Sequence, residues 1–92
     1  MLKAEFSGQF KRDYKSAIKR GCDPQKLEAV VSLLCEEQPL PEVHRDHALV
    51  NSKDYNNLRA CHIQSDWLLI YQIVHKTLVL KLIRTGSHSD LF

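Results

Sequence analysis

Histidine, aspartate and arginine side chains gather in three stretches of this chain, and these residue types can carry out acid–base chemistry. The first stretch contains His44, Asp46 and His47, the second contains His62 and Asp66, and the third contains Arg84 and His88 near the carboxyl terminus. Histidine can act as acid and as base because its unperturbed pKa of ~6.5 keeps both forms populated near neutral pH. Arginine stays charged and matches the oxygens of a phosphate.

Such a set of groups is sufficient to cleave RNA without a metal ion or a cofactor. A base takes the proton of the ribose 2′-hydroxyl, an acid protonates the departing 5′-oxygen, and a cation stabilises the charge on the phosphate. An aromatic side chain such as Phe92 or Trp67 can hold a base by stacking. Residue types and spacing alone leave open whether such a protein cleaves RNA or only binds it.

Each candidate residue also has a simpler interpretation. A loop histidine such as His44 is more often a surface residue, and Asp66 is as often a turn residue as a functional one. Trp67 begins an apolar run and is more often part of the core. Arg84 could end in a surface ion pair of little energetic value.

The cysteines argue against a metal site and for a reducing compartment. They lie far apart, at Cys22, Cys35 and Cys61, with no paired CxxC spacing. A zinc site built from His44 and His47 with His62 or Cys61 therefore has weak support. Unpaired thiols are typical of the cytoplasm, so we expect a cytoplasmic protein that needs no metal.

The first half of the chain predicts one strand and two helices. Residues Leu2–Phe6 have strand character, and Ser7 can cap a helix that runs to about Arg20 and ends at Gly21. Asp23 and Pro24 then begin a second helix that ends near Glu37. Because only a few residues join the helices, we expect an antiparallel helical hairpin.

The second half predicts a long loop and then three strands. The loop runs from Leu40 to about Asn57, and loops of this length are often functional. The strands are expected at Leu58–Ile63, Trp67–Val74 and Thr77–Arg84, joined by connections short enough for hairpins. The order β-α-α-β-β-β predicts one α+β domain over residues 1–92, with an antiparallel sheet and the helical hairpin packed on one face.

Charge and hydropathy limit the partners of this domain. No apolar run approaches the roughly 20 residues that span a bilayer, and the amino terminus lacks the features of a secretory signal, so we expect no membrane association. The first helix is strongly basic, through Lys11, Arg12, Lys15 and Lys19, among others. A basic face favours a polyanion such as RNA, although a solvated helix face is equally compatible with the pattern.

The carboxyl-terminal part of the chain resembles a known family. The motifs His62-Ile-x-x-Asp66-Trp67 and Arg84-Thr-Gly-Ser-His88, followed by Leu91-Phe92, are similar to the ending of YafQ-type toxins, which are mRNA interferases of the RelE/ParE superfamily. The loop sequence Asp46-His47-x-Leu49 and the Pro-Leu-Pro at 39–41 also resemble that group. The resemblance covers essentially the whole chain, and it implies a RelE-like fold.

The same resemblance implies an activity and partners. It implies a ribosome-dependent endoribonuclease that acts on translated mRNA and forms a hetero-oligomer with a cognate antitoxin protein. Its catalytic positions correspond to His47, His62, Asp66 and His88, its phosphate-binding position to Arg84, and its terminal aromatic to Phe92. The basic first helix would then face ribosomal RNA.

Two departures from the family pattern leave alternatives open. Relatives typically carry an acidic residue two positions before the strand histidine, where this chain has Ala60, and the loop at 50–57 is about two residues longer. A catalytically impaired toxin that binds RNA or antitoxin is therefore one alternative. A ParE-like gyrase inhibitor without catalysis is another, although such inhibitors do not need the histidine set.

Overall fold

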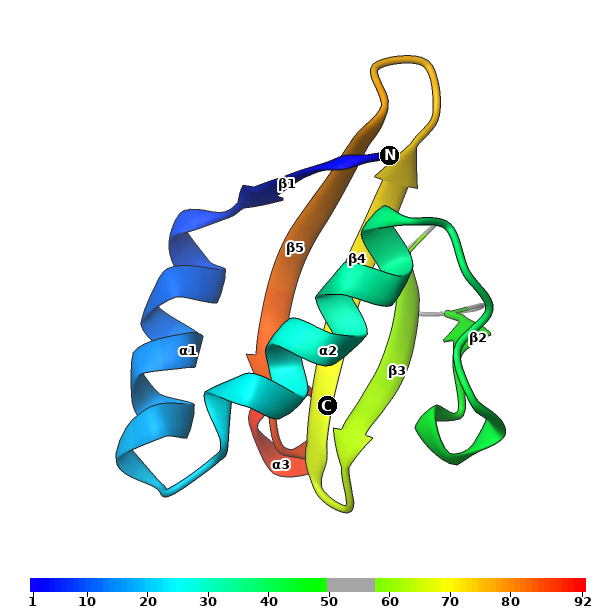
Figure 1. The fold of residues 1–92 in the computed structure, drawn as a ribbon. Coiled ribbons are helices and arrows are strands. Elements are labelled where there is room, and N and C mark those ends of the chain that lie inside the picture. The colour runs from blue at the N-terminus through cyan, green and yellow to red at the C-terminus, as the bar shows by residue number, and fades with distance from the viewer. Residues whose placement is uncertain (50–57) are drawn as a thin grey trace.

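The computed structural model describes residues 1–49 and 58–92 and contains one mixed sheet with helices on both faces (Figure 1). The elements in chain order are β1 (Lys3–Phe6), α1 (Gly8–Lys19), α2 (Pro24–Cys35), the 3₁₀ helix η1 (Glu42–His44), β2 (His47–Ala48), β3 (Arg59–Gln64), β4 (Trp67–Val74), β5 (Val79–Gly86) and α3 (His88–Leu91). No helix within these residues is long and apolar enough to cross a membrane.

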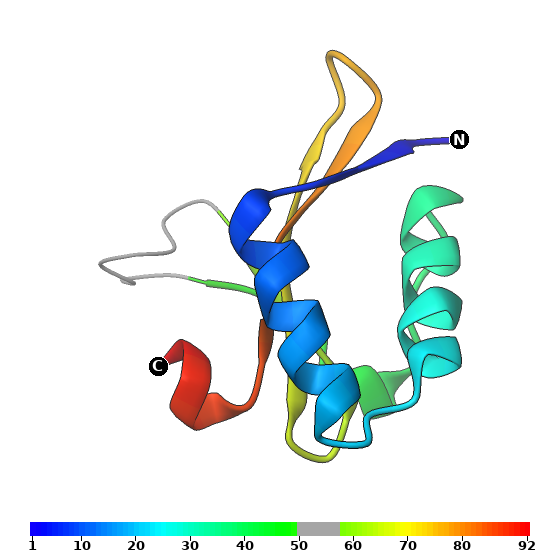
Figure 2. The same ribbon diagram turned by 90° about the vertical axis from the view of Figure 1, so that its left-hand side faces the viewer.

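The two long helices begin and end where the sequence predicts. The Ser7 side chain accepts the N–H of Phe10 at the start of α1, and Gly21 adopts a left-handed φ of 94° just after it. Asp23 caps α2 in the same way, with Pro24 as its first residue. The helices run in opposite directions, as expected of a helical hairpin (Figure 2).

The sheet has the strand order β1-β5-β4-β3-β2. The predicted hairpins are confirmed, because β3–β4 and β4–β5 are antiparallel. The sheet is nevertheless mixed: β1 pairs parallel to β5, with Lys3 opposite Val79, so the prediction of a wholly antiparallel sheet is wrong. A short hairpin requires the two strands that it joins to be antiparallel, but β1 and β5 are not joined by a hairpin. Their relative direction therefore could not be predicted from the connection between them.

The expected loop at 40–57 contains more structure than predicted. The 3₁₀ turn η1 packs beside β3, and β2 adds to the edge of β3 with His47 opposite Ala60. The altered segment at 50–57, which the sequence analysis singled out, lies outside the described residues.

The sheet separates two apolar layers. On one face, α1 covers β5 and α2 covers β3, and the layer includes Phe10, Leu27, Val30, Leu69 and Leu82. On the other face a smaller cluster contains Ala60, Leu68, Ile70 and Leu91. Figure 2 shows α2 and α3 on opposite sides of the sheet. Apolar residues that recur at helical spacing in α1 and α2 are buried or partly buried in this layer, except Ile18, which is exposed.

The chain turns back over this second face at Gly86. A side chain there would place its Cβ 2.9 Å from Oδ2 of Asp90, so only glycine allows this close approach. The Ser87 hydroxyl accepts the N–H of Asp90, and the Asp90 carboxylate accepts the N–H of Ser87, which together form a capping box. Arg20 at the end of α1 pairs with Asp90 at 2.6 Å. These contacts hold α3, and therefore His88, in place.

Candidate active site

Two of the predicted histidines meet on the sheet face that carries α3. The ring centroids of His62, on β3, and His88, at the start of α3, are 5.6 Å apart with an angle of 44° between their planes. His62 lies opposite Leu68 in the sheet, and Leu68 belongs to the smaller apolar cluster. Because side chains alternate along a strand, this face is the one opposite α1 and α2. A strand and the carboxyl-terminal tail, which are far apart in the sequence, thus come together at this pair.

Asp66 holds His88 from the turn between β3 and β4. One oxygen, Oδ1, accepts the backbone N–H of His88 at 3.1 Å and lies 3.4 Å from Nδ1 of its ring. The backbone hydrogen bond lowers the pKa of the Asp66 carboxyl, and the His88 ring lowers it further, so the group stays ionised. A carboxylate at Nδ1 favours a proton on that nitrogen and directs Nε2 outward.

His62 has a different environment. Burial lowers its pKa below the ordinary value, and the nearby basic side chains of His88 and Arg45 lower it further. Its Nδ1 is buried and has no hydrogen-bond partner within the residues that the structure describes. The uncharged form of His62 is therefore favoured, which suits a proton acceptor.

The loop histidines are held by main-chain carbonyls. His44 Nδ1 lies 2.7 Å from the carbonyl oxygen of His62, so His44 is not the surface residue that its loop position favoured. His47 Nδ1 lies 2.7 Å from the carbonyl oxygen of Arg45. Since a carbonyl only accepts, each neutral ring carries its proton on Nδ1. The unprotonated Nε2 of His47 is then available to accept a proton.

Asp46 is the centre of a polar cluster that the sequence did not reveal in full. Its Oδ1 accepts the Tyr71 hydroxyl at 2.5 Å and the Arg59 Nε–H at 3.3 Å. Tyr71 and Arg59 lie opposite each other on β4 and β3. Tyr71 belongs to an apolar run, so the sequence indicated burial of its ring but not the partner of its hydroxyl.

Arg84, the expected phosphate ligand, forms a two-pronged pair with α1. Its Nε and Nη2 each donate to Asp13 at 3.0 Å, and the Thr85 N–H also donates to Asp13. Burial alone would raise the pKa of Asp13, but these hydrogen bonds and the one from Gln9 hold it below its ordinary value. Asp13 is only 10% exposed, so this pair is more enclosed than the surface ion pair considered for Arg84.

The predicted aromatic residues separate into one surface and one core residue. Phe92 is exposed, with its ring centroid 6.2 Å from that of His88. Trp67 is buried with the helix-side residues, as the simpler interpretation held. The basic residues Lys11, Arg12, Lys15 and Lys19 are all exposed on α1, the helix that covers the opposite face of the sheet from the histidine pair.

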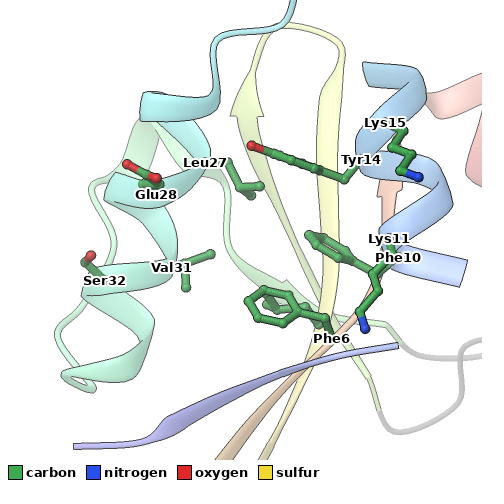
Figure 3. Close-up of a pocket in the computed structure, with 10 residues that line it drawn as sticks. Phe6, Phe10, Lys11, Tyr14, Lys15, Leu27, Glu28, Val31 and Ser32 are labelled. Carbon is green, nitrogen blue, oxygen red and sulfur yellow. The ribbon is translucent and has the colours of Figure 1, made fainter. Parts of the chain in front are cut away.

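A groove of about 690 Å³ lies between α1 and α2 on the other side of the sheet (Figure 3). Apolar side chains including Phe6, Phe10, Tyr14, Leu27 and Val31 line it. Lys11 and Lys15 stand on the α1 wall and Glu28 on the α2 wall (Figure 3). The site and the groove are therefore two separate surfaces of the molecule.

This fold, with histidines and a carboxylate on one face of the sheet and a helical hairpin on the other, defines a small α+β protein of the RelE-like toxin class. The family model described as "Bacterial toxin of type II toxin-antitoxin system, YafQ" matches residues 2–92, and the chain belongs to this YafQ family.

Individual relatives agree with this family assignment. The chain is 43% identical over 89 residues to the mRNA interferase toxin YafQ of Escherichia coli strain B / BL21-DE3, covering 96% of this chain and 92% of that one. A metal-bound toxin from Helicobacter pylori matches with a TM-score of 0.92 and 42% identity over the whole of both chains. YafQ in the E. coli DinJ–YafQ complex matches with a TM-score of 0.87 and 40% identity over 100% of this chain and 99% of that one.

The metal-bound state of the H. pylori relative prompts a test of the residues present here. Among residues 1–49 and 58–92, no three His, Cys, Asp or Glu side chains gather in a way that could hold a metal ion. Burial also raises the pKa of the Cys61 thiol to about 12, which disfavours the thiolate that a metal requires. The described side chains therefore do not fit a metal ion.

Proposed function

We propose that this protein is an endoribonuclease that cleaves mRNA by acid–base catalysis at the histidine face. The observation that carries the proposal is the His62–His88 pair, 5.6 Å apart, with Asp66 bound to His88. Two imidazoles this close to each other can both reach the oxygens of one scissile phosphate. The E. coli relative named an mRNA interferase toxin supports the same activity.

The reaction is a transfer of the phosphate to the neighbouring ribose hydroxyl. His62, which favours its neutral form, takes the proton from the 2′-hydroxyl, whose oxygen then attacks phosphorus. His88, supported by Asp66, gives a proton to the departing 5′-oxygen as the P–O bond breaks. The products are a 2′,3′-cyclic phosphate and a 5′-hydroxyl.

The remaining site residues assist this step. His47 stands on the same face and helps to polarise the 2′-hydroxyl, and Phe92 beside His88 stacks on a base. We assign Arg84 to the phosphate. Because its Nε and Nη2 donate to Asp13, binding a phosphate through these two nitrogens requires the pair to open.

The substrate is mRNA on the ribosome, and we place the protein in the cytoplasm with it. Lys11, Arg12, Lys15 and Lys19 give α1 an exposed basic surface that fits ribosomal RNA. No charged residue of this helix is needed for the acid–base steps. The ribosome would therefore supply the orientation of the substrate, and the protein the proton transfers.

A cognate antitoxin is the second partner, and the groove between α1 and α2 is the surface that fits it. E. coli YafQ was crystallised with DinJ. The groove has apolar side chains at its base, lysines on one wall and Glu28 on the other (Figure 3). It matches an amphipathic helix that carries acidic residues along the α1 edge and a basic residue along the α2 edge. Together the chains would form a toxin–antitoxin hetero-oligomer.

Primer extension on mRNA in a translation reaction tests the proposed function. We expect breaks within the reading frame that require translation and disappear in His88→Ala. Gyrase supercoiling in the same preparation should be unaffected. Inhibited supercoiling with intact mRNA would favour the non-catalytic gyrase inhibitor. If mRNA cleavage and inhibition of supercoiling are both absent, a catalytically impaired toxin is favoured.

A further inference from the structure

The carboxylate of Asp46 is fixed on one face of the sheet by two strands. Tyr71 on β4 donates its hydroxyl to Oδ1, and Arg59 on β3 donates its Nε–H to the same oxygen. The Tyr71 residue is 1% exposed and belongs to the apolar layer under α1 and α2. Because the Tyr71 ring cannot move without disturbing that layer, its hydroxyl is a rigid anchor.

The next residue, His47, points to the other face. His47 pairs with Ala60 and Ala48 pairs with Arg59, and residues that pair directly lie on the same side of a sheet. Ala60 belongs to the histidine-side cluster, whereas Arg59 meets Tyr71 on the helix side. Anchoring Asp46 on the helix side therefore sets the register of β2 and directs His47 toward the face that holds His62.

A short strand needs such an anchor. Strand β2 has only two residues, His47 and Ala48, so its own ladder fixes its register weakly. Immediately before it, Arg45 adopts a left-handed conformation with φ 47°, which turns the chain from η1 into β2. A slip of one residue would reverse the faces and remove His47 from the site.

This chain also lacks a polar neighbour opposite His47. Ala60 is fully buried and its methyl group packs in the smaller apolar cluster, where the family resemblance leads one to expect an acidic side chain. The His47 ring contacts the carbonyl oxygen of Arg45, two residues away. The orientation of His47 therefore depends on the backbone that Asp46 fixes.

We propose that Tyr71 and Arg59 are positioning residues, which hold Asp46 on the helix side of the sheet and thereby aim the His47 imidazole at the site of cleavage. Neither side chain touches the substrate, and both act through His47. The inference rests on the proposed ribonuclease function, but its structural part can be tested without activity.

The test is a double-mutant cycle between Tyr71→Phe and His47→Ala, read as the single-turnover rate of mRNA cleavage on ribosomes. Tyr71→Phe removes only the hydroxyl, so we expect a loss of about tenfold or more in the wild-type background. The same change should cause no further loss in the His47→Ala background, because the residue through which it acts is absent. Equal losses in both backgrounds, or no loss in the wild type, would overturn the proposal.

Two sets of control variants separate positioning from general damage. Asp46→Asn keeps an oxygen that can accept the Tyr71 hydroxyl and should retain more activity than Asp46→Ala. Ser16→Ala removes an exposed hydroxyl from α1 and should leave the rate unchanged. Circular dichroism confirms that each variant is folded at the assay temperature.

An NMR measurement decides the structural part by itself. The ring nitrogen spectrum of His47 should show one neutral tautomer protonated at Nδ1 in the wild type, and a mixture of tautomers in Tyr71→Phe. If the wild type does not cleave mRNA but Tyr71→Phe shows the mixture of His47 tautomers, the proposed function is wrong and the positioning role of Tyr71 is supported. An unchanged His47 signal in Tyr71→Phe refutes the anchor whatever the activity.

Discussion

Oδ1 of Asp66 accepts the backbone N–H of His88 at 3.1 Å and lies 3.4 Å from Nδ1 of the same residue. One carboxylate oxygen thus contacts both the backbone at the first turn of α3 and the imidazole ring of His88. The contact joins the β3–β4 turn to the carboxyl-terminal tail, and it fixes both the position of His88 and which of its ring nitrogens points away from Asp66.

We expect Asp66→Asn to lower kcat for mRNA cleavage by roughly tenfold or more with little change in KM, because the amide cannot stabilise a charged imidazole. Stability should change little, since the Asp66 side chain is 66% exposed. Single-turnover rates and urea unfolding measure the two effects. Asp23→Asn, which keeps an effective N-cap on α2, is the matched control. A pure KM effect would argue against this role.

The pKa of His62 should be measurably low. Burial is the larger cause and the charge of His88 a smaller one, so NMR titration of the wild type should give a midpoint below 6.5. In His88→Gln the midpoint should rise but remain below 6.5. Because the folded pKa lies below the unfolded one, the stability that neutral His62 provides is lost as pH falls from 6.5 through the folded value. A wild-type midpoint at or above 6.5 would contradict the assignment of His62 as base.

The pair between Asp13 and Arg84 should contribute to stability. We expect Asp13→Asn to lower the free energy of unfolding by about 1.5–3 kcal/mol at pH 7, because a hydrogen-bonded charge is lost in a partly buried place. The folded pKa of Asp13 is lowered, so this contribution is present above its ordinary value of 3.8 and is lost as pH falls through the folded value. Urea unfolding at pH 7 and pH 3 should show the gap between wild type and variant shrinking. An equal gap at both pH values would refute this explanation.

If the antitoxin docks in the groove between α1 and α2, its affinity should depend on the charges of the groove walls. Lys11→Glu places an acid on the α1 wall and should weaken antitoxin affinity by about tenfold, measured by calorimetry. Lys19→Glu changes the same charge on the same helix outside the groove and should have a much smaller effect. Equal effects of the two changes would indicate general electrostatic attraction rather than docking in the groove.

Local signals explain how much of the fold the sequence predicts. Ser7, Gly21 and the Asp23–Pro24 pair act within one helical turn, so they place α1 and α2 to within one or two residues. The hairpin strands follow from short connections. The parallel pairing of β1 with β5 depends on residues more than 70 positions apart, for example Lys3 and Val79, and no local pattern encodes it.

The residue types of the candidate site could be predicted from the sequence, but most of the contacts that hold these residues in position could not. The tail helix α3 could have been recognised from Ser87 and Asp90, which have the spacing of a capping box. The roles of Tyr71 and Asp13 could not, because each is defined by a partner on a distant element. A side chain buried in an apolar run gives no sign of where its hydroxyl points.

The chemistry of the RNA ends tests the central claim most directly. mRNA cut by this protein in a translation reaction is recovered, and the new ends are identified by their susceptibility to phosphatase and kinase. With His62 as base and His88 as acid at one phosphate, we expect a 2′,3′-cyclic phosphate or 3′-phosphate on one fragment and a 5′-hydroxyl on the other, with cutting abolished in His88→Ala. Fragments with a 3′-hydroxyl and a 5′-phosphate would contradict attack by the ribose hydroxyl, and with it the proposed mechanism.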